Sequence, residues 1–131
     1  MDGLITQPSA FGVKETMDRL EADVRKKGMT VFARVDHAAG ASAVGLALRA
    51  TELLIFGNAR VGTPLMQGDQ TIGLDLPLKV LVWEDAAGQT SLAYYEPRVL
   101  LGRPGVAADH ASITLMSAVL AGLAKAATVV G

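Results

Sequence analysis

The sequence contains no cysteine, and this absence excludes several kinds of site at once. Without thiols the chain has no disulfide framework, no Cys-based zinc site, no iron–sulfur cluster and no thiol nucleophile. It has only two histidines, His37 and His110, and they are far apart in the sequence. The ligand spacings of transition-metal sites are therefore missing. The sequence predicts neither a metal nor a cofactor.

The sequence also has no clear excess of acidic or of basic residues. Lys and Arg number 12, Asp and Glu number 13, and the formal net charge is −1. No basic field is present that would attract nucleic acid, so we expect no nucleic-acid partner. Charged residues make up 19% and hydrophobic residues 50%, which excludes a disordered chain. A chain of 131 residues predicts one domain over residues 1–131 that folds without covalent cross-links.

The N-terminal residues lack the basic region and apolar run of a signal peptide, so a cytoplasmic protein is expected. Residues 111–131 are the one candidate for a membrane span, because Lys125 is their single charged residue. This segment is rich in alanine and contains serine and threonine, which insert poorly into a bilayer. The sequence favours a buried helix here and predicts no membrane association.

Apolar spacing along the chain predicts alternating strands and helices. Val13, Met17, Leu20 and Val24 share one face of a helix that ends near Gly28. Strands are expected at 4–7, 30–36, 51–56, 78–84 and 90–96, and further helices at 38–46, 59–68 and 108–130. The order β-α-β-(α)-β-α-β-β-α predicts an α+β fold, a two-layer sandwich with helices packed on one mixed or largely antiparallel sheet. The first β-α-β unit is compatible with a right-handed parallel crossover.

Two segments are apolar on more than one side. The continuous run Leu53-Leu54-Ile55-Phe56 predicts a central strand that is buried on both faces. The last helix has almost no polar face, so it should be covered on several sides. A sheet covers only one of them, so the sequence predicts a homodimer through the C-terminal helix.

Two positions carry side chains suited to acid–base chemistry. His37 follows Asp36, and an Asp–His pair can act as a base with its orienting group. Neighbouring side chains on a strand point to opposite faces, however, which argues against a direct bond between them. Asp75 lies between leucines just before a strand, either as a general acid or base or ligand anchor, or as a carboxylate that bonds a turn. Near His110, Asp109 is the expected helix cap.

Other segments favour structural interpretations. The glycine-containing stretch 56–66 lacks a GxGxxG pattern and a P-loop ending, so it predicts a tight turn and a helix capped by Asn58 or Thr63. Trp83, Tyr94 and Tyr95 gather in the predicted 78–96 hairpin, either to line a pocket or to pack across the sheet.

Five short motifs in order resemble a bacterial and archaeal family, the domain-of-unknown-function family numbered 302. They are Asp36-His37, Phe56-Gly57-Asn58, the run 62–66 (Gly-Thr-Pro-Leu-Met), the run 74–79 (Leu-Asp-Leu-Pro-Leu-Lys) and the run 82–85 (Val-Trp-Glu-Asp). The resemblance covers about residues 3–128 and implies a small α+β fold that is compatible with homodimers. It implies no established activity. The family often has proline after the Phe-Gly-Asn step, where this chain has Ala59, and this departure supports Asn58 as a helix cap.

Three functions remain open at this point. The first is a non-catalytic dimeric module that binds a small, partly apolar molecule, with His37, Asn58, Asp75 and Tyr95 as the polar groups around its pocket. The second is a structural module or one that binds a protein partner. The third is a small enzyme that uses His37 or Asp75 as an acid or base, which requires these side chains to meet at a pocket. Because the sequence has few side-chain patterns that are typical of catalysis, it favours a function without catalysis.

Overall fold

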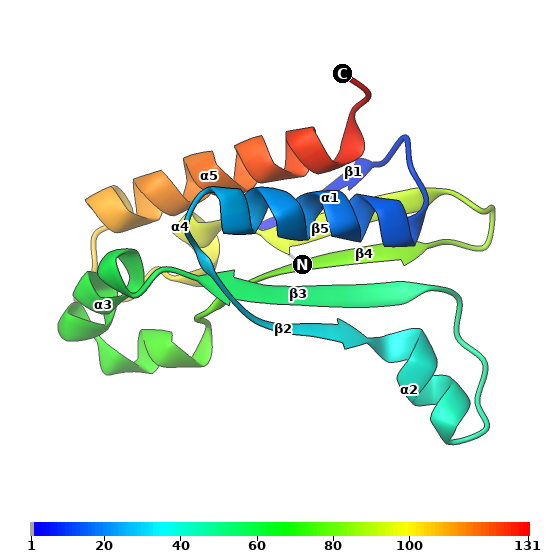
Figure 1. The fold of residues 1–131 in the computed structure, drawn as a ribbon. Helices are drawn as coiled ribbons and strands as arrows, with labels where there is room; N and C mark the ends of the chain where they lie inside the picture. The colour runs from blue at the N-terminus through cyan, green and yellow to red at the C-terminus, as the bar shows by residue number, and fades with distance from the viewer. Residues whose placement is uncertain (1) are drawn as a thin grey trace.

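Five antiparallel strands form one sheet in the computed structural model, which describes residues 2–131 (Figure 1). The strands are β1 (Leu4–Pro8), β2 (Thr30–Asp36), β3 (Thr51–Gly57), β4 (Leu78–Glu84) and β5 (Thr90–Tyr95). Their order across the sheet is β1-β5-β4-β3-β2. This confirms the predicted α+β fold with a largely antiparallel sheet. β1 and β2 are not neighbours, because they form opposite edges of the sheet.

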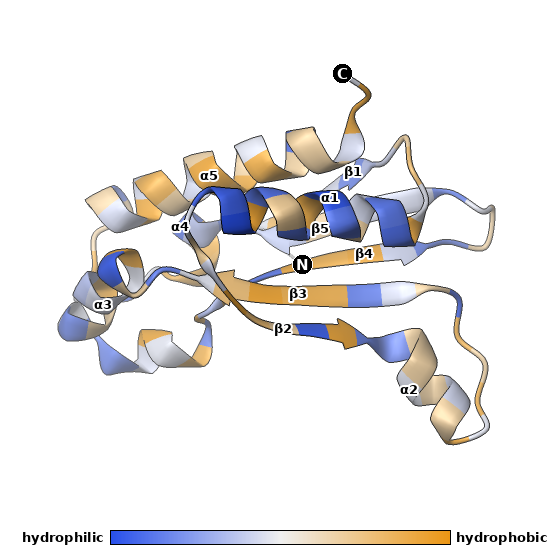
Figure 2. Ribbon diagram, viewed as in Figure 1, coloured by the Kyte–Doolittle hydropathy of each residue, from blue (hydrophilic) through white to orange (hydrophobic). Residues whose placement is uncertain are grey.

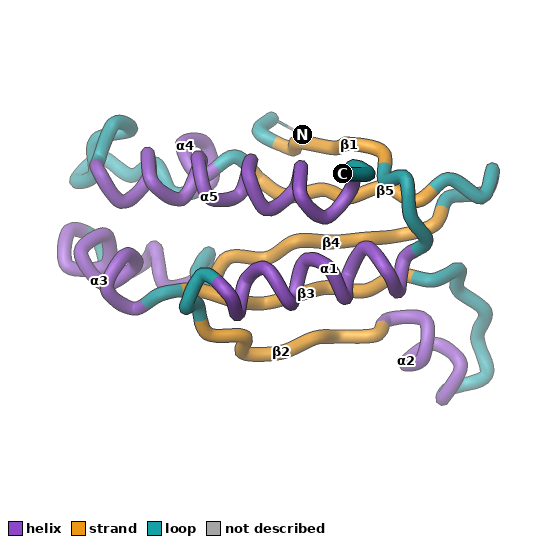
Figure 3. Tube along the Cα trace, turned by 45° about the horizontal axis from the view of Figure 1, so that its top comes forward, coloured by secondary structure: helices purple, strands orange, loops and turns teal. Residues whose placement is uncertain are grey.

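The helices are α1 (Val13–Lys26), α2 (His37–Ala43), α3 (Ala59–Gly68), α4 (Pro97–Leu100) and α5 (Ala111–Thr128), with a 3-10 turn η1 at Gln70–Leu74. α1 and α5 lie side by side on one face of the sheet, as Figure 3 shows. α3 and η1 lie at the end of the sheet where β3 finishes, and α2 stands beyond the end of β2 (Figure 1).

The core lies between the two long helices and the sheet. α1 buries Val13, Met17, Leu20 and Val24, the four residues that the spacing predicts. Its outward face is hydrophilic (Figure 2). The helix begins at Gly12, without a side-chain cap, and Gly28 follows it with φ +78°. That positive φ suits glycine, which has no Cβ to clash.

α5 packs on the sheet as a core helix. It buries Ile113, Met116, Leu120 and Leu123 among others, while Ala118, Ala121 and Gly122 on its outward side are exposed. By length and composition α5 could also cross a membrane, a test that core helices pass as well. Its cap is His110, whose Nδ1 accepts a hydrogen bond from the Ser112 backbone N–H at 3.0 Å. The expected cap Asp109 was wrong by one residue.

β2 contains a register shift at Phe32, between Val31 and Ala33. Val31 pairs with Phe56 and packs against the core, whereas Ala33 pairs with Ile55 on the opposite face. Simple alternation along the predicted strand 30–36 places Val31, Ala33 and Val35 on one face, and this prediction is wrong for Val31. A bulge adds one residue to a strand, and this reverses the alternation beyond it. The sequence marks the bulge by the apolar Phe32 at a position where alternation calls for a polar residue.

Arg34 ties α1 to the sheet. Its guanidinium contacts Glu52 on β3 at 2.8 Å and, on α1, Asp18 at 2.7 Å and Glu21 at 3.2 Å. Lys14 and Arg34 lower the pKa of the Asp18 carboxyl, and Arg25 and Arg34 lower that of Glu21. The partly exposed cluster at one edge of the two-layer core therefore consists of Arg34, Asp18, Glu21 and Glu52.

The second face of the sheet carries no layer of helices in the described part of the chain (Figures 1 and 3). Along β3, Leu54 and Phe56 face the helices and are fully buried, whereas Leu53 and Ile55 point the other way and are half-buried. The prediction that this strand is buried on both faces is thus met on one face only. We call the other face the open face.

Candidate functional site

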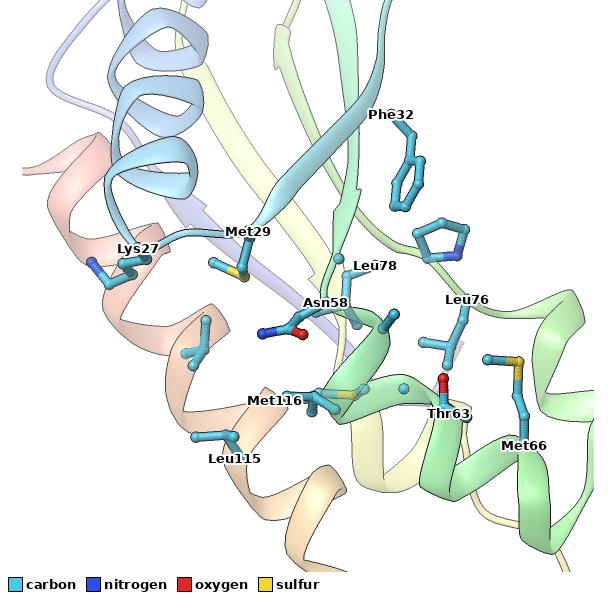
Figure 4. A pocket seen from close by; sticks show the side chains of 16 residues that line it. Lys27, Met29, Phe32, Asn58, Thr63, Met66, Leu76, Leu78, Leu115 and Met116 are labelled. Carbon is cyan, nitrogen blue, oxygen red and sulfur yellow. The ribbon is translucent and has the colours of Figure 1, made fainter.

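A cavity lies where α3, α5 and the end of α1 meet (Figure 4). Its volume is about 420 Å³, which is within the range of small-molecule sites. Its walls are mainly apolar and include three methionines from separate segments, Met29, Met66 and Met116. Figure 4 shows Leu115 and Met116 on the α5 side and Thr63 and Met66 on the α3 side. We call this space the apolar cavity.

Asn58 lies at the apolar cavity, at the point where β3 ends and α3 begins. Its side-chain oxygen accepts a hydrogen bond from the Arg60 backbone N–H at 2.9 Å. This confirms Asn58, and not Thr63, as the cap of α3 and the structural interpretation of the glycine-containing stretch. The cap fixes the start of the helix that forms one wall of the cavity.

Close packing around one glycine shapes the same wall. Gly62 is buried, and a Cβ there would lie 3.2 Å from Leu76 Cδ1. Leu76 lines the cavity too. Gly62 therefore lets α3 pack closely against the segment before β4 at this space.

The polar side chains at the apolar cavity are Lys27, Asn58 and Thr63, and all three residues are exposed. Lys27 Nζ forms an ion pair with Asp23 Oδ1 at 2.7 Å. The cavity thus combines an apolar interior with a few polar groups that reach solvent. Such a lining suits a molecule with an apolar body and one polar end.

Asp75 and Tyr95 line a second, smaller cavity of about 180 Å³, together with Lys79 and three leucines. Asp75 Oδ2 accepts a hydrogen bond from Arg103 Nη2 at 2.5 Å. Nη1 of Arg103 donates to the carbonyl oxygens of Leu100 and Gly102, at 3.0 Å each. The Asp75 carboxylate is therefore half of an ion pair that joins two connecting segments, and its partner was missed because Arg103 lies in an irregular stretch.

His37 lines neither cavity and is exposed as the first residue of α2. Asp36, its neighbour, caps this helix by accepting a hydrogen bond from the Ala39 N–H at 2.9 Å. The structure thus divides the four predicted site residues. Asn58 lies at one cavity, Asp75 and Tyr95 lie at another, and His37 stands apart from both.

Among residues 2–131, no three His, Asp or Glu side chains come close enough together to hold a metal ion. The residues that sequence reasoning missed are apolar ones, chiefly Met29, Met66 and Val119. Methionine is unbranched and polarizable, and it is common at surfaces that adapt to varied ligands. The cavity is lined by three of the five methionines of the chain. Their presence is the feature of the sequence that could have pointed to this site.

Comparison with known families agrees with this architecture. The family model described as "Domain of unknown function DUF302" matches residues 5–128. The chain belongs to the DUF302 family. A crystal structure of an uncharacterized conserved DUF302 protein from Bacillus stearothermophilus has the same fold, with a TM-score of 0.84 and 20% identity over 97% of this chain and 99% of that one.

The curated relatives that this DUF302 chain matches are named as fluoride-specific ion channels. The fluoride-specific ion channel FluC 1 of Brucella suis is 50% identical over 101 residues, which are 77% of this chain and 40% of that protein. FluC 1 of Brucella abortus and FluC 2 of Brucella melitensis match at the same identity, with 37% of each protein covered. The chain spans about two-fifths of the length of these relatives, so most of each channel protein lies outside the match.

Proposed function

We propose that this DUF302 domain binds a small, partly apolar molecule in the apolar cavity and does not transform it. The observation that carries the proposal is the volume of about 420 Å³ lined by methionine, leucine, valine and proline. Burial of an apolar ligand there would gain roughly 25 cal/mol for each Å² removed from water. Lys27, Asn58 and Thr63 would orient its polar end.

The groups at the cavity favour binding without catalysis. Within the described residues its lining contains no carboxylate and no imidazole. The amine of Lys27 is held by Asp23. A general acid or base must come within hydrogen-bond reach of the substrate. Asp75 is paired with Arg103 at the other cavity, and His37 lies at neither. These placements favour the binding function over the acid–base enzyme.

The test uses the fluorescent probe anilinonaphthalene sulfonate, which has an apolar body and one anionic group. Val61 lines the apolar cavity, and Val61→Phe would fill part of it. Val130→Phe is the matched control, because Val130 is 73% exposed in the C-terminal tail. Both variants keep every other apolar surface of the chain.

The proposal predicts that Val61→Phe weakens probe binding at least several-fold, while Val130→Phe binds like the wild type. Circular dichroism checks that both variants remain folded. Equal binding by all three proteins would contradict the proposal.

The channel relatives favour a second candidate function, that of a domain that works together with a fluoride channel. The 50% identity over 101 residues carries this candidate. It fits the interpretation of the chain as a module with a protein partner. Deletion of the segment that encodes the domain should then lower growth in fluoride but not in chloride of equal concentration. Unchanged growth in fluoride would contradict it.

A further inference from the structure

The centre of the open face is apolar, where an antiparallel sheet in contact with water is usually polar. One row of paired residues crosses all five strands on this face: Val35, Leu53, Leu81, Ala93 and Thr6. Four of these five residues are apolar. Leu53 and Leu81 at the centre are half-buried although no helix covers them in the described chain. Figure 2 shows that β3 and β4 are hydrophobic along much of their length.

A second apolar surface lies beyond the end of β2. Residues 37–48, which we call the arm, comprise α2 and the loop that follows it. The arm carries no Asp, Glu, Lys or Arg, and α2 has no buried residue. Val44, Leu46 and Leu48 are 72%, 67% and 50% exposed. Exposed apolar segments of this extent mark surfaces that meet a partner.

We propose that a second copy of this chain covers the open face, and that the two arms complete the interface. The area of the open face supports this occupant. Five strands about 4.8 Å apart and about six residues long cover roughly 24 Å by 20 Å, or about 480 Å². A stable interface needs about 800 Å² from each partner, so the sheet alone falls short by about 300 Å².

The arm is a second apolar surface of the same chain and would supply the remaining interface area. In a twofold dimer each surface patch meets a partner patch from the same sequence, so any contact made by one arm is made twice. A second copy therefore offers a use for both apolar surfaces at once. It also accounts for the run 53–56, which reads as a strand covered on both faces.

This interface differs from the predicted homodimer through the C-terminal helix. The outward side of α5 consists of small residues such as Ala118, Ala121 and Gly122, with Leu115 as its large exposed side chain. Leu115 lines the apolar cavity as well. The helix thus offers less apolar surface to a partner than the open face and the arm do.

The test compares charges placed on the two candidate surfaces. Leu81→Asp puts a carboxylate at the centre of the open face, and Ala118→Asp puts one on the outward side of α5. Light scattering after size-exclusion chromatography gives the mass. We expect the wild type and Ala118→Asp at twice the 13.6 kDa of the chain, and Leu81→Asp at 13.6 kDa.

Two further readouts keep the result decisive if Leu81→Asp fails to fold. Leu46→Ser changes only the arm, and it should raise the dissociation constant of the dimer at least tenfold. Trp83, the one tryptophan of the sequence, projects from β4 on the same side as Leu81. Its emission should shift to longer wavelength as the wild type is diluted and dissociates.

Three results would overturn the proposal. The first is a wild type with the mass of one chain at every concentration, including one that binds phospholipid vesicles through the arm. The second is dissociation by Ala118→Asp with no effect of Leu81→Asp. The third is a dimer that Leu46→Ser does not weaken. None of these outcomes depends on a ligand in the apolar cavity, so the two proposals fail separately.

Discussion

The two faces of the sheet differ in what covers them, although both faces are apolar at the centre of β3 and β4. Leu54 faces α1 and α5 and is 0% exposed, whereas Leu53 faces away from them and is half-buried. The two leucines are neighbours on the same strand. The composition of a strand therefore indicates that a face is suited to burial. It does not indicate which other part of the structure covers that face.

The neighbouring strand shows the same difference between the two faces. β4 repeats the pattern of β3, since Val80 and Val82 face the helices and Leu81 and Trp83 face away. An antiparallel sheet with one face in water normally alternates apolar and polar residues. The departure from this alternation is greatest on the central row of the open face, which is where we place a second copy.

The largest expected effect comes from truncating the two neighbouring leucines. Leu54→Ala removes a fully buried side chain and should lower the free energy of unfolding by about 2–5 kcal/mol. Leu53→Ala should cost about 1 kcal/mol in the monomer, because that side chain is already partly in water. Urea unfolding at two protein concentrations measures both values.

The dependence on protein concentration distinguishes the two variants in that experiment. The cost of Leu54→Ala should be the same at both concentrations, and the cost of Leu53→Ala should grow at the higher one, where the wild type gains stability from association. Equal costs for the two variants would contradict the difference between the faces.

A smaller effect is expected at the edge of the covered face. Arg34→Met removes the contacts to Asp18, Glu21 and Glu52 and should lower the free energy of unfolding at neutral pH by about 1–2 kcal/mol. Methionine retains much of the apolar stem, so packing changes little. Lys14→Met is the matched control, because its ion pair with Asp18 is largely exposed and should matter less.

The effect of Arg34→Met on the free energy of unfolding should depend on pH in a definite direction. The pKa values of Asp18 and Glu21 are lowered in the fold, so their stabilisation is complete above the ordinary carboxyl pKa and is lost as the pH falls through the folded values. The difference between wild type and Arg34→Met should therefore shrink between neutral pH and about pH 3. A difference that stays constant with pH would show that Arg34 acts through packing alone.

The smallest effect concerns the cap of α3, a wall of the apolar cavity. Asn58→Ala removes the hydrogen bond to the Arg60 N–H and should cost about 1 kcal/mol. Thr63→Ala, at the alternative cap position, should change the free energy of unfolding by less than about 0.5 kcal/mol. Thermal unfolding of both variants is the measurement, and a larger loss in Thr63→Ala would reverse the assignment of the cap.

Much of the fold was predictable because the periodic segments are long. The β4–β5 hairpin and the apolar run of β3 are predicted within about one residue of their observed bounds, and the spacing in α1 predicts its buried residues. Local sequence could not give the order of the strands, since the placement of β1 beside β5 depends on contacts between distant segments. The bulge at Phe32 showed only as an irregularity until the register was known.

The candidate site was less predictable than the fold. Asn58 was chosen from its place after a strand and does lie at the apolar cavity. His37 and Asp75 were chosen for their chemistry, but one belongs to the arm and the other is paired with Arg103. The lining itself is mostly apolar, and from sequence an apolar residue of a cavity wall looks like a core residue.

Native mass spectrometry of the protein purified from its own host tests the central claim most directly, namely that the apolar surfaces left open by one chain are occupied. The account predicts twice the 13.6 kDa of the chain, with a reproducible small adduct on each copy that Val61→Phe loses. A single chain of 13.6 kDa without an adduct would contradict it.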